Sequence, residues 1–201
     1  MKVVKVALIW IALAISIAVP FGVAAQSPLL AWRQPVYIIA GFSGVTALAF
    51  LLLQPLLIGG YLPGLSNRRG RSVHRIVGAC LVGAVVVHVA GLWITSPPDV
   101  IDALLFVSPT PFSDWGVIAM WAVFAAALLA MLRKRLRPNV WRIGHTVCVA
   151  LAVMMSVAHA MLVEGTMGMV SKVMLCILVI GAALKVIIER RAWQFLMRRR
   201  R

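Results

Sequence analysis

The chain has 201 residues; 63% of them are apolar, 12% are charged, and the mean hydropathy is +1.01. A soluble domain is closer to roughly half apolar and a quarter charged, so this composition excludes a soluble globular enzyme and predicts an integral membrane protein. The formal net charge of +15 would suggest nucleic-acid binding in a soluble chain. Here the basic residues flank apolar runs, which is typical of membrane topology, so we expect membrane lipid and no nucleic acid around this chain.

Six apolar runs are each long enough to cross a bilayer as a helix. The first follows Lys2 and Lys5 and ends in small residues, so it is either a retained helix or a cleaved secretory signal; we expect a retained helix. A proline-rich loop with three aspartates follows the third run, and we expect a short interfacial helix at residues 99–107 within it. The six predicted spans are residues 3–25, 35–58, 73–94, 115–132, 140–162 and 172–188.

These spans predict an all-α, polytopic membrane bundle of six helices. We divide the chain into residues 1–34, the first helix with its outer loop; residues 35–190, one helical membrane domain; and residues 191–201, a basic cytoplasmic tail. Three cysteines fall inside the spans, where they behave as small apolar side chains rather than as a disulfide framework. No Cys-x-x-Cys-His sequence is present, which excludes covalent c-type haem attachment.

The basic residues are distributed unequally between the two sides of the predicted bundle. With both termini on one side, that side holds 18 of the 20 Lys and Arg residues, the exceptions being Arg33 and Lys172. The positive-inside rule then makes this side cytoplasmic, with the protein in the inner membrane. The third and fifth spans both run from the inner to the outer face, so they are parallel.

The four histidines of the chain lie on these two parallel spans. His74 and His88 are fourteen residues apart, and so are His145 and His159. Fourteen residues of helix make nearly four turns and rise about 21 Å, so each pair lies on nearly one face at two depths. The spacing therefore predicts two facing pairs of imidazoles, one near the inner face and one in the outer half.

Ionisable side chains inside a membrane span are costly and usually functional. Zinc needs three or four ligands, commonly including Cys or a carboxylate, and the spans offer no carboxylate near the histidines. Two facing imidazoles suit haem, which supplies four equatorial nitrogens itself. Four basic residues are candidate partners of haem propionates: Arg75 and Arg142 near the inner pair, and Arg33 and Lys172 on the outer side.

The pattern resembles the ferric-reductase-like transmembrane family, which includes the membrane domains of NADPH oxidases and ferric reductases, the STEAP reductases, and the haem subunit of the bacterial periplasmic methionine sulfoxide reductase. The resemblance covers about residues 35–190. By resemblance, His74 with His145 would bind the inner of two b haems, and His88 with His159 the outer. The residues that carry it are His74-Arg75-Ile76-Val77-Gly78 with His88, and Trp141-Arg142-Ile143-Gly144-His145 with His159.

Oxidases and ferric reductases of this family carry a cytoplasmic flavin and nicotinamide domain after the sixth helix. Residues 189–201 contain no nucleotide-binding motif, so we expect a separate electron donor, either a flavoprotein or quinol. The resemblance implies a b-type cytochrome, an oxidoreductase component that passes single electrons outward to a ferric chelate or a periplasmic redox partner. Two alternatives remain open: a cytochrome subunit of a quinone-linked dehydrogenase complex, and a non-redox metal transporter or assembly factor.

Overall fold

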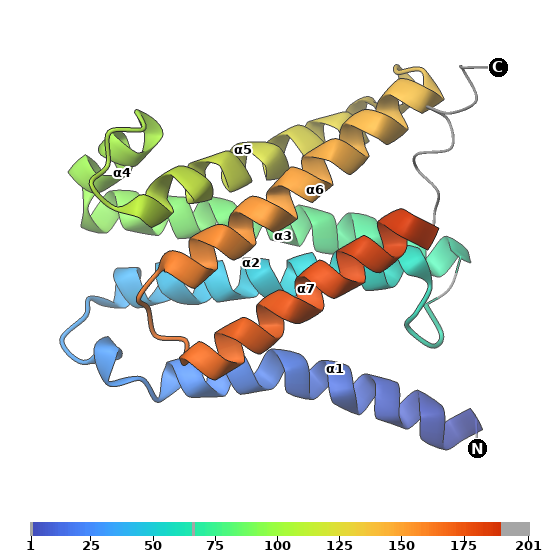
Figure 1. Ribbon diagram of the computed structural model, residues 1–201, viewed down its shortest axis with the longest axis horizontal. Helices are drawn as coiled ribbons and strands as arrows, with labels where there is room; N and C mark the ends of the chain where they lie inside the picture. The colour runs from blue at the N-terminus through green and yellow to red at the C-terminus, as the bar shows by residue number, and fades with distance from the viewer. Residues whose placement is uncertain (1, 66, 190–201) are drawn as a thin grey trace.

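The computed structural model describes residues 2–65 and 67–189, and the regular structure in this part of the chain is all helical, without strands (Figure 1). Two 3-10 turns, Pro28–Leu30 and Leu132–Lys134, interrupt the connections between helices. The predicted tail, residues 191–201, lies outside the described residues. The α-helices are α1 (Lys2–Ala25), α2 (Pro35–Gly59), α3 (Asn67–Thr95), α4 (Pro97–Leu104), α5 (Pro111–Met131), α6 (Pro138–Leu162) and α7 (Met169–Glu189).

The six predicted spans are confirmed: α1, α2, α3, α5, α6 and α7 are each long and apolar enough to cross a membrane. Two of them, α3 and α5, begin at least one helical turn earlier than the apolar runs indicate. Helix α3 starts at Asn67, so its first turns hold basic residues that precede the predicted span. Arg is a good helix former, and its long side chain can reach the membrane surface. Helix α5 starts at Pro111, because the fixed φ of proline favours the first turn of a helix.

The short interfacial helix also exists, but its bounds differ from the predicted residues 99–107. Helix α4 begins at Pro97, where proline again occupies the first turn, and ends at Leu104. Phe106 has a φ of 58°, a left-handed conformation that cannot continue a right-handed helix. The chain therefore turns at that point and enters α5.

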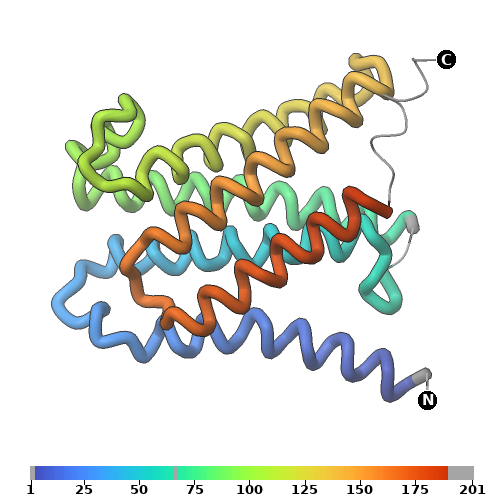
Figure 2. The backbone as a smooth tube through the Cα atoms, in the orientation of Figure 1, coloured from blue at the N-terminus to red at the C-terminus, as the bar shows by residue number. Residues whose placement is uncertain are grey.

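The bundle is built from two antiparallel hairpins. Helix α2 packs along α3 and α5 packs along α6, whereas α3 and α6 contact each other far less (Figure 2). Helix α7 packs against α2 and α6, and α1 lies at the edge of the bundle beside α7. The α2–α3 contact is close because Gly91 has no side chain: a Cβ there would lie 2.7 Å from the Cβ of Ala40. Small residues permit such close helix packing in membranes.

The two ends of the bundle differ in charge. Helix α1 begins and α7 ends at the same end, together with the α2–α3 loop and the α5–α6 turn (Figure 1). We call it the basic end because it carries Arg68, Arg133 and their basic neighbours. The opposite, acidic end carries α4 and the α6–α7 loop. Its four acids are Asp99, Asp102, Asp114 and Glu164.

The apolar core occupies the middle of the bundle. Leu175 and Val179 of α7 are completely buried and pack with Leu48 of α2, Leu81 of α3 and Ala152 of α6. Because lipid tails are as apolar as these side chains, van der Waals packing holds the two hairpins and α7 together. The histidines lie above and below this layer, at the two ends of the interior.

Candidate functional site

The structure brings the four histidines together as two couples inside the bundle. The rings of His88 and His159 have centroids 6.3 Å apart and planes inclined at 79°; we call these two residues the acidic-end couple. His74 is close enough to His145 for the two side chains to interact electrostatically, and these form the basic-end couple. All four side chains are half-buried. The parallel course of α3 and α6 puts each couple at one level.

Each imidazole of the acidic-end couple is fixed by the helix that packs beside its own. The Nδ1–H of His88 donates to the carbonyl oxygen of Ala40 at 2.7 Å, and that of His159 donates to the carbonyl oxygen of Phe112 at 2.8 Å. A carbonyl can only accept, so Nδ1 carries the proton in both rings. The two rings are therefore held in the same tautomer.

The basic-end couple is held in the same way. The Nδ1–H of His74 donates to the carbonyl oxygen of Gln54 at 3.3 Å, and that of His145 donates to the carbonyl oxygen of Ala126 at 3.1 Å. The Gln54 side chain adds a second link, because its amide nitrogen donates to the carbonyl oxygen of His74 at 3.2 Å. Trp141, one turn before His145, stacks on that ring with centroids 5.7 Å apart and planes at 16°.

The accepting carbonyls repeat the spacing of the histidines. Ala40 and Gln54 are fourteen residues apart on α2, and Phe112 and Ala126 are fourteen residues apart on α5. The hairpins α2–α3 and α5–α6 therefore position their histidines by the same kind of hydrogen bond. Because an antiparallel neighbour keeps its register, equal spacing on one helix requires equal spacing on the other.

Two glycines extend this correspondence at the acidic end. A Cβ at Gly44 would lie 3.1 Å from the ring of His88, and a Cβ at Gly116 would lie 2.7 Å from Nδ1 of His159. Each glycine comes one turn after the residue whose carbonyl accepts the proton, Ala40 or Phe112. The absence of a side chain leaves room for the imidazole against the backbone of the neighbouring helix.

The hydrogen bonds leave Nε2 of every histidine unprotonated, with its lone pair available to a metal. Metal-binding histidines commonly donate the other ring nitrogen to a carbonyl or carboxylate, which fixes the tautomer and raises the basicity of the ligand. The same arrangement occurs at all four histidines. The four side chains thus have the chemistry of metal ligands.

The donor set fits haem better than a bare metal ion. Among the residues that the structure describes, no group of three or more His, Cys, Asp or Glu side chains could hold an ion. Two imidazole–metal bonds of about 2.0 Å each, plus the ring radii, give a centroid separation of about 6 Å, close to the 6.3 Å of His88 and His159. The weak direct packing of α3 on α6 is also suited to a planar group between them.

The predicted propionate partners lie in different surroundings. Arg75 and Arg142 are exposed at the basic end. Arg33 is exposed in the loop before α2, and its guanidinium lies over the ring of Tyr37 at 4.7 Å. Lys172 is buried and its Nζ donates to the carbonyl oxygen of Val163 at 2.7 Å. The role of these four cations as propionate partners stays a prediction.

Sequence reasoning missed Gly44 and Gly116, and it named Trp141 only within the sequence that carries the resemblance. Gly44 and Gly116 are 72 residues apart, almost the separation of 71 residues between His74 and His145. A search for glycines that repeat at this separation would have found them only with a tolerance of one residue. Nothing in the sequence marks the carbonyls of Ala40, Gln54, Phe112 and Ala126, because every residue has a carbonyl.

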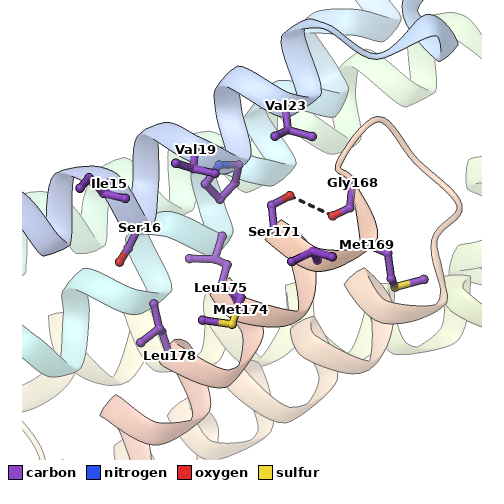
Figure 3. Close-up of a pocket in the computed structure, with 12 residues that line it drawn as sticks. Ile15, Ser16, Val19, Val23, Gly168, Met169, Ser171, Met174, Leu175 and Leu178 are labelled. Carbon is purple, nitrogen blue, oxygen red and sulfur yellow. Dashed lines mark hydrogen bonds between the residues drawn. The ribbon is translucent and has the colours of Figure 1, made fainter.

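A cavity of about 490 Å³ lies away from the histidines, between α1 and the start of α7 (Figure 3). Its lining is apolar apart from two serines and backbone, and it contains no titratable side chain. Ser171, which lines it, donates to the carbonyl oxygen of Gly168 at 2.9 Å. This cavity is therefore separate from the two couples.

These features define a polytopic membrane protein whose interior holds two couples of histidines. Residues 39–157 match the family described as ferric reductase like transmembrane component. The match covers more than half of the chain, and the chain belongs to this family. His74, His88 and His145 lie within the matched residues, and His159 lies two residues beyond them. Searches of curated proteins and of solved structures found no significant match.

Proposed function

We propose that this protein is a b-type cytochrome that carries single electrons across the inner membrane. His74 with His145 and His88 with His159 would each provide the two axial ligands of a haem b, two haems in all. The observation that carries the proposal is the fourfold repetition of one hydrogen bond, Nδ1–H to a carbonyl of the adjacent helix. This bond prepares Nε2 as a ligand and is not required by packing alone.

Haem b, when bound, supplies a one-electron ferric/ferrous couple. The histidines would fill both axial positions, which favours electron transfer over oxygen binding. Leu81 and Ala152, each midway between the histidines of its helix, are 7% and 3% exposed. This apolar layer keeps water from the space between the couples and lowers its dielectric constant.

The charge distribution supports the orientation in the membrane, and the outward direction of transfer is what the resemblance to the family implies. The basic end would be cytoplasmic by the positive-inside rule, with both termini on that side. A flavoprotein or quinol would deliver electrons to the basic-end couple, and the acidic-end couple would pass them to a ferric chelate or a periplasmic redox partner. This makes the protein a membrane oxidoreductase component that works with a separate donor.

The test is the optical spectrum of the purified protein in detergent, with a haem-to-protein ratio. We expect a b-type spectrum and about two haems per chain, with one haem lost on His88→Ala and the other on His145→Ala. Cys148→Ala is the control, because Cys148 lies on the same helix as His145, and this variant should keep both haems. A ratio near one would leave a single-haem cytochrome, and a colourless wild-type protein would favour the non-redox alternative. Stable co-purification with a dehydrogenase would favour the quinone-linked alternative.

A further inference from the structure

Lys172 is the one buried charged side chain in the part of the chain that the structure describes. It lies in the first turns of α7 and is only 5% exposed. Its Nζ donates to the carbonyl oxygen of Val163 at 2.7 Å. A buried lysine is costly in a protein interior and more so within a membrane, and it usually has a function.

This ammonium group lies close to the acidic-end couple. Val163 ends α6, and its backbone nitrogen donates to the carbonyl oxygen of His159 at 3.0 Å. Lys172 thus contacts the backbone one helical turn from a proposed haem ligand. Allowing for that turn and the length of the side chains, the charge would lie about 10–15 Å from the metal.

No described carboxylate neutralises this charge. The one ion pair among the described residues joins Lys185 to Glu189, at the other end of α7. Glu164, next to Val163, is exposed. Asp114 belongs to the acidic end and has one carboxylate oxygen buried without a hydrogen-bond partner. It is two residues from both Phe112 and Gly116, so helical periodicity places it on another side of α5 than the residues beside His159, and it forms no ion pair with Lys172.

The cations of the basic end differ from Lys172 in exposure. Arg75 and Arg142 are exposed, where water and salt screen their charge. A buried charge is screened much less, so its field reaches further through the apolar interior. The two couples therefore experience unequal positive potentials, although most of the basic residues lie at the other end.

We propose that Lys172 is a fixed cation that raises the reduction potential at the acidic-end couple relative to the basic-end couple. A nearby positive charge disfavours the ferric state, which carries one more positive charge than the ferrous state. At about 10–15 Å and an effective dielectric constant of about 20, a unit charge changes the equilibrium constant for reduction of the iron by a factor on the order of ten. The electron is thereby drawn toward the acceptor end. The inference rests on the proposed cytochrome function.

The test measures the midpoint potential of each couple separately, in two single-couple backgrounds. His145→Ala leaves the acidic-end couple intact, and His88→Ala leaves the basic-end couple intact. In each background Lys172 is changed to Gln, whose amide can still donate to the Val163 carbonyl, and to Arg, which keeps the charge. Lys185→Gln is the matched control, because it removes an exposed lysine of the same helix.

We expect Lys172→Gln to lower the midpoint potential of the acidic-end couple and to leave that of the basic-end couple within error. Lys172→Arg and Lys185→Gln should leave both unchanged. The inference would be overturned if Lys172→Gln shifted both midpoint potentials equally or shifted neither. It would also be overturned if haem were lost in both Lys172→Gln and Lys172→Arg. Lys172 would then be only a cap of α6. A wild-type protein without haem would instead refute the proposed function, so the two failures are distinguishable.

Discussion

Alanine at Gly116 tests the hypothesis that this glycine makes room for the ring of His159. The new Cβ would lie 2.7 Å from Nδ1 of His159 and 2.9 Å from Cε1. Ordinary van der Waals contact begins at about 3.4 Å, so the ring would have to move by roughly 0.7 Å. That movement would strain the 2.8 Å hydrogen bond to Phe112, and overpacking of this kind costs about 1–3 kcal/mol.

Alanine at Gly44 should have a smaller effect. Its Cβ would lie 3.1 Å from the ring of His88, so a shift of a few tenths of an ångström relieves the contact. In both variants alanine also gains up to about 1 kcal/mol of helix propensity over glycine. We therefore expect little change in the melting temperature of either variant and a selective loss at the acidic-end couple, greater for Gly116→Ala.

The assay is the haem-to-protein ratio together with the spectrum of the remaining haem. Gly41→Ala on α2 and Gly181→Ala on α7 are the controls, because a Cβ at either position meets nothing within 4 Å. Both should keep the full haem content and melt at the same temperature or higher. The reasoning is refuted if Gly116→Ala retains the acidic-end haem with an unchanged spectrum, or if the controls lose haem to the same extent.

Three further substitutions test other parts of the structure. Trp141→Leu removes the ring stacked on His145 and should shift the spectrum or midpoint potential of the basic-end haem alone; a change at both haems would contradict a local role. Tyr61→Phe removes the hydrogen bond to Glu189 and should cost about 0.5–1.5 kcal/mol of stability or less at this exposed site, measured by thermal unfolding with unchanged haem content. Leu175→Ala leaves a cavity in the core, where this side chain is 1% exposed, and should cost about 2–5 kcal/mol; an unaltered melting temperature would show that the core is not packed as described.

Much of the fold follows from the sequence because the bilayer restricts what a chain can do. An apolar run of this length must satisfy its backbone hydrogen bonds internally, so each of the six runs is a helix. The first and last residues of the helices follow less directly from the sequence. Arg68 and Pro111 both lie inside helices although they stand outside the apolar runs, because helix propensity and proline geometry act beyond the hydrophobic boundary.

The candidate site could also be predicted in part, because helical periodicity acts within each span. The equal spacing of His74–His88 and His145–His159 shows that each pair shares a helix face, and the alternating direction of the spans makes those helices parallel. That reasoning does not say which helix lies beside which. The importance of Gly44 and Gly116 depends on α2 packing against α3 and α5 against α6, and no pattern within a single helix contains that information.

The sequence by itself determined a six-span helical membrane protein with four histidines at two depths, because hydropathy and helical periodicity act locally along the chain. Only the tertiary structure decided that His88 faces His159, that every Nδ1–H donates to a carbonyl of the neighbouring helix, and that Lys172 is buried beside the end of α6. These properties depend on the register and close approach of helices distant in sequence. The hydrogen-bond partners are backbone atoms common to all residues, so only packing distinguishes them.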